Sequence, residues 1–212
     1  MVESCNATRR PGNPRVPERV SDPVLHVIAG PNGAGKSTLY DKVLGPVTHL
    51  QFVNADVIAA ESWPLDPVSH AYEAARIAAT ERERLIEIRR SFVTETVFSH
   101  ESKLAMLRGA EAAGYRVILH IVLIPEELAV ARVLDRVRNG GHAVPEDKVR
   151  SRIARLWTYL GEAIGLVDEA RVYDNTSAHH PFELLATYVD GHLTNDPRWP
   201  SWSPDALRRA GA

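Results

Sequence analysis

The chain has 212 residues, of which 44% are hydrophobic and 25% charged, a balance typical of one globular domain rather than of a disordered chain or a coiled coil. Its 25 Lys and Arg against 27 Asp and Glu leave a formal charge of −2, which excludes a global positive field for nucleic acid or anionic membranes. The single cysteine, Cys5, excludes an internal disulfide and a cysteine metal cluster. The apolar runs are too short to span a bilayer and the start lacks a secretory signal, so we expect a cytoplasmic protein that binds neither membrane nor nucleic acid.

Residues 1–22 are rich in proline, glycine and arginine and have almost no apolar pattern, so we expect a flexible arm ahead of a domain over residues 23–195. In that domain, short apolar runs alternate with longer stretches of helical period, which indicates a doubly wound α/β fold with a five-stranded parallel sheet. The expected strands are Leu25–Ala29, Gln51–Val53, Ser91–Thr94, Arg116–Leu123 and Arg171–Tyr173. One expected helix begins near Lys36. The four others cover Pro67–Arg90, Glu101–Ala113, Pro125–Arg138 and Pro145–Ile164.

Beyond the last expected strand, His180 and Pro181 are expected to open a final helix. Residues 196–212 then form an expected C-terminal tail, in which Trp199 and Trp202 lie among prolines. We favour packing of the indoles onto the domain surface, because aromatic side chains are mostly buried for their area, and docking of a partner is the alternative.

The strongest signal is GPNGAGKST, in which Gly30 is followed by four residues and then by Gly35, Lys36 and Ser37. An apolar run leads into this motif and a helical pattern leads out of it, as a phosphate-binding loop requires. The backbone N–H groups and the helix N-terminus attract phosphate, Lys36 is a point charge for the β- and γ-phosphates, and the Ser37 hydroxyl is placed to bind Mg²⁺. We therefore predict a P-loop NTPase whose nucleotide site comprises Gly30, Asn32, Gly33, Ala34, Gly35, Lys36, Ser37 and Thr38.

The rest of the sequence has to show how the triphosphate is used. A guanine-reading Asn-Lys-x-Asp motif is absent from the sequence, so we expect ATP. Motor and AAA+ ATPases usually have a larger frame and an apolar strand that ends in a carboxylate, and the nearest equivalent here is the run from Ser91 to Glu95. Glu95 is expected at the carboxyl edge of the sheet, where it would hold Mg²⁺ through water or bind an acceptor hydroxyl. Its alternative role is a charge at a helix N-terminus.

Asp56 closes the second expected strand and also projects from the carboxyl edge of the sheet. A carboxylate there accepts the proton of an acceptor hydroxyl as it attacks the γ-phosphorus, which is what a kinase requires. The alternative is that Asn54 or Asp56 caps a short helix from Val57 to Glu61, a role that both residue types fill well. We favour the functional role, and the two roles do not exclude each other.

Basic residues gather between residues 126 and 157, where two helices are expected on either side of Asn139-Gly140-Gly141. Their expected apolar stripes are Val130, Val133, Leu134 and Val137, and then Val149, Ile153, Leu156 and Leu160. Arg132 and Arg136 share one face of the first helix, and Arg152 flanks the stripe of the second together with Lys148 and Arg155. We expect a helical lid over about residues 132–155, with Arg136 and Arg152 as catalytic arginines; for any single arginine, a solvated helix face is the alternative.

Two further positions complete the expected site. His142, in the Gly-Gly-His segment, is a polar lid residue rather than a metal ligand, because no second histidine or cysteine has ligand spacing to it. Asn175 follows the fifth expected strand at the ligand edge, where it either borders the adenine or forms part of a turn built by Asp and Asn.

In this order the motifs resemble those of the zeta toxin family of phosphate-loop kinases, in its short form. The resemblance rests on AGPNGAGKST, NADVIA, SFVTETVFS, RVRNGGHAVPEDKVRSRIARLW and VYDNT, and it spans about residues 23–175. It implies ATP-dependent phosphorylation of the 3′-hydroxyl of the UDP-N-acetylglucosamine sugar, and an antitoxin partner that covers the ATP site. It also implies that Lys36 binds the phosphates, that Asp56 is the base, and that Glu95, with Thr96 beside it, lies in the acceptor pocket.

The chain departs from the longer toxins in two ways. It is too short for their additional substrate-binding segments, and it has His142 near the place where they have an arginine. The first hypothesis is therefore an ATP-dependent phosphotransferase for a small-molecule hydroxyl, with a UDP-sugar as the expected acceptor, Mg²⁺ held by Ser37 and Glu95, and a possible antitoxin. The alternatives are a P-loop kinase for another metabolite or an antibiotic, and a regulatory ATP-binding module without useful transfer.

Overall fold

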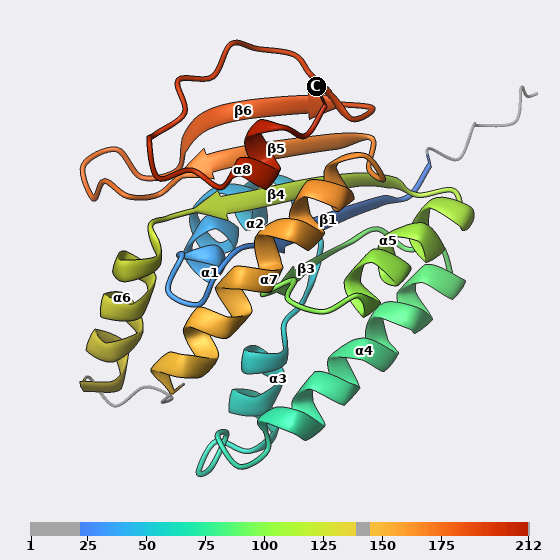
Figure 1. Ribbon diagram of the computed structural model, residues 1–212. Helices are drawn as coiled ribbons and strands as arrows, with labels where there is room; N and C mark the ends of the chain where they lie inside the picture. Colours follow the sequence, from blue (N-terminus) through green and yellow to red (C-terminus); the bar gives the residue numbers. More distant parts are fainter. Residues whose placement is uncertain (1–21, 139–144, 212) are drawn as a thin grey trace, which may run out of the picture.

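The computed structural model describes residues 22–138 and 145–211 of the chain. A seven-stranded sheet lies at its centre, with strand order β2-β3-β1-β4-β5-β6-β7 (Figure 1). The strands are β1 (Val24–Ala29), β2 (Gln51–Val53), β3 (Phe92–Thr96), β4 (Arg116–Leu123), β5 (Glu169–Asp174), β6 (Glu183–Val189) and β7 (His192–Leu193). The helices are α1 (Lys36–Leu39), the π-helix η1 (Tyr40–Leu44), α2 (Gly45–Thr48), α3 (Ala55–Ser62), α4 (Ala71–Glu87), α5 (Ser102–Ala112), α6 (Glu126–Arg138), α7 (Glu146–Ile164) and α8 (Asp205–Arg208).

The five strands expected from the sequence form the parallel part of this sheet, because β2, β3, β1, β4 and β5 pair with one another in parallel. The α/β prediction is thus confirmed. Parallel pairing brings the carboxyl ends of these strands to one edge of the sheet, the edge at which α/β folds bind ligands. Most of the arm expected over residues 1–22, the Gly140–Gly141 hinge of the expected lid and His142 lie outside the described residues.

The helix expected to begin at His180 is wrong, because Glu183–Val189 forms β6 and pairs antiparallel with β5. Buried Ala186 and Tyr188 alternate with more exposed neighbours, which is the period of a strand. Asp190 and Gly191 then connect β6 to β7 with positive φ angles of 49° and 78°. An Asp-Gly pair between apolar runs is a strong hairpin signal, so the sequence did contain the evidence for this antiparallel extension.

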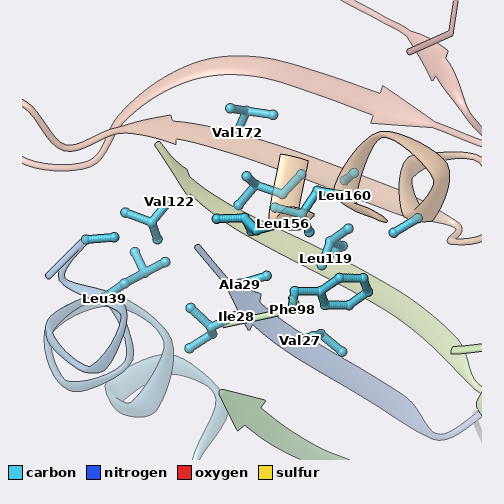
Figure 2. Packing of buried hydrophobic residues seen from close by; sticks show 14 of the residues in the cluster. Val27, Ile28, Ala29, Leu39, Phe98, Leu119, Val122, Leu156, Leu160 and Val172 are labelled. Atoms are coloured by element: carbon cyan, nitrogen blue, oxygen red, sulfur yellow. The ribbon is translucent and has the colours of Figure 1, made fainter. Parts of the chain in front are cut away.

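Side chains from both faces of the sheet build the core. On one face Val27 and Leu119 lie toward α7, whose Leu156 and Leu160 are fully buried against the sheet (Figure 2). On the other face, Ile28 and Val122 lie near Leu39 of α1 (Figure 2). Figure 1 shows α4, α5 and α7 in front of the sheet and α2 behind it, so helices cover both faces as a doubly wound fold requires.

Two expected details of the helices have different outcomes. The apolar stripe of α7 is buried as expected, at Val149, Ile153, Leu156 and Leu160. On α6 the buried residues are Ala129, Val130 and Val133, whereas Leu134, expected on the stripe, is 45% exposed. Across the described ranges, no helix has both the length and the apolar character needed to cross a membrane.

The C-terminal tail packs onto the domain. Leu207 of α8 is fully buried against the core, and its carbonyl oxygen accepts a 2.8 Å hydrogen bond from the Tyr188 hydroxyl. Trp199 packs against the core as expected, while Trp202 remains 36% exposed. The tail therefore contributes apolar contacts to the α7 side of the sheet.

Candidate functional site

The loop between β1 and α1 holds its shape because glycines occupy the positions where a side chain would collide. Gly30 has a φ of 150°, and a Cβ there would lie 2.5 Å from the Val122 carbonyl oxygen. Gly35 has a φ of 91°, and a Cβ there would lie 2.6 Å from the Asn175 side-chain nitrogen. Larger residues cannot adopt this backbone without strain or displacement of these neighbours. The loop backbone is thus free to face a ligand closely.

Asn175 and Arg132 hold this loop from behind. The Asn175 side-chain amide donates a 2.7 Å hydrogen bond to the Ala34 carbonyl oxygen. The Arg132 guanidinium donates to the Gly33 carbonyl oxygen at 3.4 Å and to the Asn175 carbonyl oxygen at 3.0 Å. Asn175, expected to border the adenine or to form part of a turn, holds the loop and does not line the main cavity. The neighbouring Asp174 side chain accepts a 2.8 Å hydrogen bond from the Thr176 N–H, as the turn alternative expects.

Glu95, at the carboxyl end of β3, joins three elements. Its Oε2 accepts hydrogen bonds from the Ser37 hydroxyl at 2.8 Å and from the Asn54 side-chain nitrogen at 2.7 Å. Its Oε1 lies 3.6 Å from the Lys36 ammonium, and the Glu95 side chain is only 11% exposed. The alternative of a charge at a helix N-terminus does not describe this geometry, because α5 begins later, at Ser102.

Lys36 points into the same cluster from the start of α1. It is 6% exposed, and its Nζ donates a 3.0 Å hydrogen bond to the Pro31 carbonyl oxygen. An ammonium has three N–H donors, so this bond and the Glu95 contact leave one for a ligand. Burial beside a single carboxylate also makes this cation a strong local attractor for an anion.

After β2, one residue caps the next helix and another residue presents a carboxylate. Asn54 is the N-cap of α3, because its side-chain oxygen accepts hydrogen bonds from the backbone N–H groups of Asp56 and Val57 at 2.7 and 3.4 Å. The Asp56 carboxylate is exposed and, within the described residues, has no hydrogen-bond or ion-pair partner. Asn54 therefore satisfies the helix start, and the carboxylate of Asp56 is left available.

Loop, strand ends and helices enclose one cavity of about 610 Å³, a volume typical of small-molecule sites. Six of the expected loop residues line it: Asn32, Gly33, Gly35, Lys36, Ser37 and Thr38. Gly30 and Ala34 are buried behind the loop. Asp56, Glu95 and Thr96 line the same cavity, so the cradle and the carboxylate of Asp56 face one space. The Thr96 hydroxyl accepts a 3.1 Å hydrogen bond from the Phe98 N–H, which turns the chain away after β3.

The expected catalytic arginines also reach this cavity. Arg136 of α6 and Arg152 of α7 line it, together with Arg132. Arg150 ties the two helices together, since it forms ion pairs with Glu126 and Glu127 of α6 and with Glu146 of its own helix. The basic residues of this segment therefore divide between the cavity and the contact that joins α6 to α7.

Two cavity residues were missed by the sequence analysis, namely Arg82 of α4 and Lys103 of α5. Arg82 follows Ala74 and Ala78 along the buried stripe of its helix, at the i, i+4, i+8 spacing. A charged residue on an apolar stripe was the available signal for Arg82. Lys103 carried no comparable signal, because it becomes part of the site only through the packing of α5 beside α4.

The charge of this cavity differs in sign from that of the whole chain. Two carboxylates line it, those of Asp56 and Glu95, against six basic side chains: Lys36, Arg82, Lys103, Arg132, Arg136 and Arg152. The chain as a whole has a formal charge of −2. Clefts lined by one sign of charge concentrate ligands of the opposite sign, so this cavity is built for anions.

Solved structures with the same fold include proteins described as kinases and toxins. A chain in the AvrRxo1-ORF1:AvrRxo1-ORF2 complex with sulphate ions matches with a TM-score of 0.64 at 18% identity, over 82% of this chain and 60% of that one. The same complex with ATP matches with a TM-score of 0.63 at 18% identity and the same coverage. The PezAT toxin-antitoxin system of Streptococcus pneumoniae matches with a TM-score of 0.53 at 14% identity, over 76% of this chain and 72% of that one.

At these identities the likeness concerns the fold alone. This chain spans less than two thirds of the AvrRxo1 chain that it matches. Among curated proteins, an uncharacterized protein of Haemophilus influenzae is 32% identical over 124 residues, which cover 58% of this chain and 87% of the relative.

The AAA domain family AAA_33 matches residues 25–157, which include the phosphate loop, Asp56, Glu95 and both helices of the basic segment. A structure described as a putative kinase from Chloroflexus aurantiacus also matches, with a TM-score of 0.51 at 16% identity, over 63% of this chain and 78% of that one. The chain belongs to the AAA domain family AAA_33.

Proposed function

We propose that this chain is an ATP-dependent phosphotransferase that moves the γ-phosphoryl group to a hydroxyl of a small molecule. The observation that carries the proposal is the position of Asp56, whose unpartnered carboxylate lines the same cavity as Lys36 and Ser37. A site that only bound a nucleotide would not require a free carboxylate facing the phosphate cradle. A kinase requires one, because the acceptor hydroxyl loses its proton during transfer.

The loop residues fit the triphosphate of ATP. Backbone N–H groups of the glycine-rich segment and the start of the helix at Lys36 provide positive partial charges. Lys36 adds a full charge, and its ammonium is almost completely buried beside the loop. These groups support ATP as the phosphoryl donor, and the AvrRxo1 complex solved with ATP shares the fold.

Ser37 and Glu95 fit Mg²⁺, because a hydroxyl and a carboxylate oxygen lie 2.8 Å apart at the end of the phosphate loop. When bound, Mg²⁺ supplies charge neutralisation at the β- and γ-phosphate oxygens. Asn54 orients the Glu95 carboxylate by donating to Oε2 at 2.7 Å. Such outer partners fix the direction in which a ligating oxygen points.

In the transfer step the acceptor oxygen forms a bond to the γ-phosphorus, and the bond from that phosphorus to the oxygen bridging to the β-phosphate breaks. ADP leaves with the electron pair of the broken bond, and the hydroxyl proton moves to the Asp56 carboxylate. Lys36 and the arginines Arg136 and Arg152 stabilise the negative charge on the transferring group. Binding in one cavity brings hydroxyl and phosphorus together.

For the acceptor we propose a UDP-sugar, with UDP-N-acetylglucosamine first, and for the partner an antitoxin-like protein. The support is the zeta-toxin-like order of motifs, together with a shared fold with the toxin-antitoxin system PezAT. The positive cavity is consistent with an acceptor that itself carries phosphate. The partner is testable by co-expression with the product of the neighbouring gene, which should co-purify in a defined ratio and suppress transfer.

The experiment that tests this function is incubation of the full chain with ATP, Mg²⁺ and a panel of UDP-sugars, free sugars and hydroxylated antibiotics. Mass spectrometry should find one acceptor with a gain of about 80 Da, which is one phosphoryl group. ADP should appear in equal amount, and only when that acceptor is present. Phosphate release at the same rate with and without every acceptor would contradict the proposal and favour an ATP-binding module without transfer.

A further inference from the structure

Arg82 is a buried cation without a counter-charge. It lies on α4, is 9% exposed, and forms no hydrogen bond or ion pair with any residue in the described ranges. Burial lowers the pKa of its guanidinium, and Glu83, whose charge acts in the opposite direction, lies beyond ion-pair distance. Arginine side chains are almost never buried unless they are paired. No nitrogen of Arg82 is fully enclosed, so the stem is buried while the guanidinium reaches the cavity, where an anion can bind it.

Lys103 of α5 is a second cation beside it. It is partly buried, and its ammonium forms no hydrogen bond or ion pair in the part of the chain that the structure describes. Arg82 and Lys103 line the same two cavities, which places the two side chains near each other. Burial lowers the pKa of the Lys103 ammonium, and repulsion by Arg82 lowers it further. Two like charges in a desolvated place destabilise the folded chain unless an anion lies between them.

The pair lines the part of the cavity wall that α4 and α5 provide. Figure 1 shows α4 and α5 side by side on one side of α3 and α7, with α6 on the other side. Both residues line the cavity that holds the phosphate loop, but Lys36 and Arg132 already serve the loop end. Arg82 and Lys103 form no hydrogen bond or ion pair with the described loop residues. Their charges are therefore available to a molecule other than the nucleotide triphosphate.

A second cavity of about 500 Å³ between α4 and α5 also touches the pair, but Glu83 and Glu87 line it. Carboxylates repel an anion from that side. On the side of the main cavity, basic side chains outnumber carboxylates six to two. An anion therefore reaches the pair from the main cavity, the space into which Asp56 also faces.

We propose that Arg82 and Lys103 bind an anionic group of the phosphoryl acceptor, a phosphate or a carboxylate distinct from the hydroxyl that reacts. This inference rests on the proposed function and assigns two residues to the anionic group of the acceptor; the diphosphate of a UDP-sugar is one such group. A guanidinium binds either group through two parallel N–H donors, and an ammonium adds a point charge. The pair thus orients the acceptor while Asp56 receives its proton.

The test uses the full chain saturated with Mg²⁺ and a non-hydrolysable ATP analogue, so that the phosphate loop is occupied. Titration calorimetry then measures binding of inorganic pyrophosphate, with malonate in a parallel arm to distinguish a phosphate site from a carboxylate site. The variants Arg82→Met and Lys103→Met keep the apolar stem and remove the charge. Exposed basic residues of the same two helices give the matched controls Arg76→Met and Arg108→Met.

We expect each of the two site variants to weaken binding of the preferred anion by about 10-fold or more, as loss of a charge-assisted contact does. The control variants should remain within about 2-fold of the wild type, and all four should bind the ATP analogue normally. Failure of the loaded wild type to bind either anion, or equal binding by wild type and site variants, would overturn the inference. Absence of transfer to any acceptor would instead contradict the proposed function, because this binding measurement needs no transfer.

Thermal unfolding separates a binding role from a structural role. Removal of an unpartnered buried charge should raise the melting temperature of Arg82→Met by about 2–4 °C. Pyrophosphate should raise the melting temperature of the wild type and leave that of the variant unchanged, because only a bound ligand stabilises the fold. A lower melting temperature of Arg82→Met, together with unchanged anion binding, would assign Arg82 to the core and overturn the proposal.

Discussion

The two ends of the cavity differ in how their charges are satisfied. At the phosphate-loop end, Lys36 contacts Pro31 and Glu95, and Glu95 accepts from Ser37 and Asn54. At the α4–α5 end, Arg82 and Lys103 have no such contacts among the described residues. One end is organised before any ligand arrives, whereas the other leaves its charges to the ligand.

This difference separates what any P-loop protein needs from what a particular substrate needs. Preorganised charges bind and stabilise a group without rearrangement, which suits a triphosphate that is the same in every turnover. Unpartnered buried charges reduce stability, and proteins retain such features mainly where function depends on them. The loop end therefore accounts for the shared chemistry, and the α4–α5 end for the choice of acceptor.

The largest effect on ligand binding should come from the phosphate-loop end of the cavity. Lys36→Ala removes a buried charge that faces the phosphates and leaves Glu95 without its cation. ATP binding should weaken by about 30- to 1,000-fold, the range for loss of one member of a buried charged pair. Fluorescent-nucleotide titration measures this, with exposed Lys42→Ala as the control. ATP binding within about 3-fold of wild type in Lys36→Ala would break the comparison, because the loop end would then need no fixed charge.

Next in size is the backbone of the same loop. Gly35→Ala places a methyl group 2.6 Å from the Asn175 amide at a φ of 91°, so the hydrogen bond that holds Ala34 must move. We expect a loss of about 3 kcal/mol in the free energy of unfolding, from strain and displacement together. Urea denaturation measures it. A variant as stable as the wild type would show that Asn175 does not fix the loop.

A buried polar cluster around His120 lies outside the cavity and contributes no residue to it. Its side chains are hydrogen-bonded to one another, so they need no ligand. His120 is fully buried, with its Nε2 3.0 Å from His26 Nδ1 and its Nδ1 3.2 Å from the Tyr173 hydroxyl. Burial, aided by the charges of His26 and Arg171, lowers the pKa of His120 from 6.5 to about 3. The imidazole is thus neutral in the folded chain at every pH above that value.

Because the folded pKa lies below the unfolded one, protons bind the unfolded state more readily, and stability is complete above pH 6.5 and falls as the pH decreases toward 3. At pH 5 His120 should account for a loss of about 2 kcal/mol in the free energy of unfolding. Urea denaturation at pH 7.5, 6 and 5 measures it, and His120→Gln should show a smaller decrease. Equal pH dependence of the two proteins would contradict the role assigned to His120.

The smallest effect should come from Gly109 of α5, which lines the second cavity rather than the main one. A Cβ at Gly109 would meet no atom within 4 Å, and the residue lies inside a helix. Gly109→Ala should therefore stabilise the chain by about 0.5–1 kcal/mol, through helix propensity alone. Thermal unfolding measures this gain against the loss expected for Gly35→Ala. A loss of stability would mean that α5 packs more tightly than its open surroundings show.

Sequence reasoning reached the parallel sheet and the phosphate loop because both are encoded locally. Gly30 and Lys36 lie in one short motif, and apolar runs mark each strand. Asp190 and Gly191 signal the β6–β7 hairpin, but Pro181 also favours the start of a helix, and the two local signals conflict. The structure follows the Asp-Gly turn, so the turn signal is the stronger of the two at this position.

Other features of the site arise from packing between distant segments and are invisible to local patterns. The Asn175 side chain is hydrogen-bonded to Ala34, which lies 141 residues away in the sequence. No local sequence pattern near either residue indicates that contact. Arg82 and Lys103 become a pair only when α4 and α5 lie together. The end of the cavity that we assign to the acceptor was therefore the part that the sequence alone did not predict.

The most direct test of the account is Asp56→Asn in the full chain, with phosphoryl transfer and ATP affinity measured on the same preparation. Loss of the proton acceptor should slow transfer by about 10²- to 10⁴-fold, while the dissociation constant for ATP stays within about 3-fold of wild type. Glu61→Gln, an exposed carboxylate at the other end of α3, is the control. Transfer at the wild-type rate in Asp56→Asn would contradict the claim that this carboxylate faces and deprotonates the acceptor.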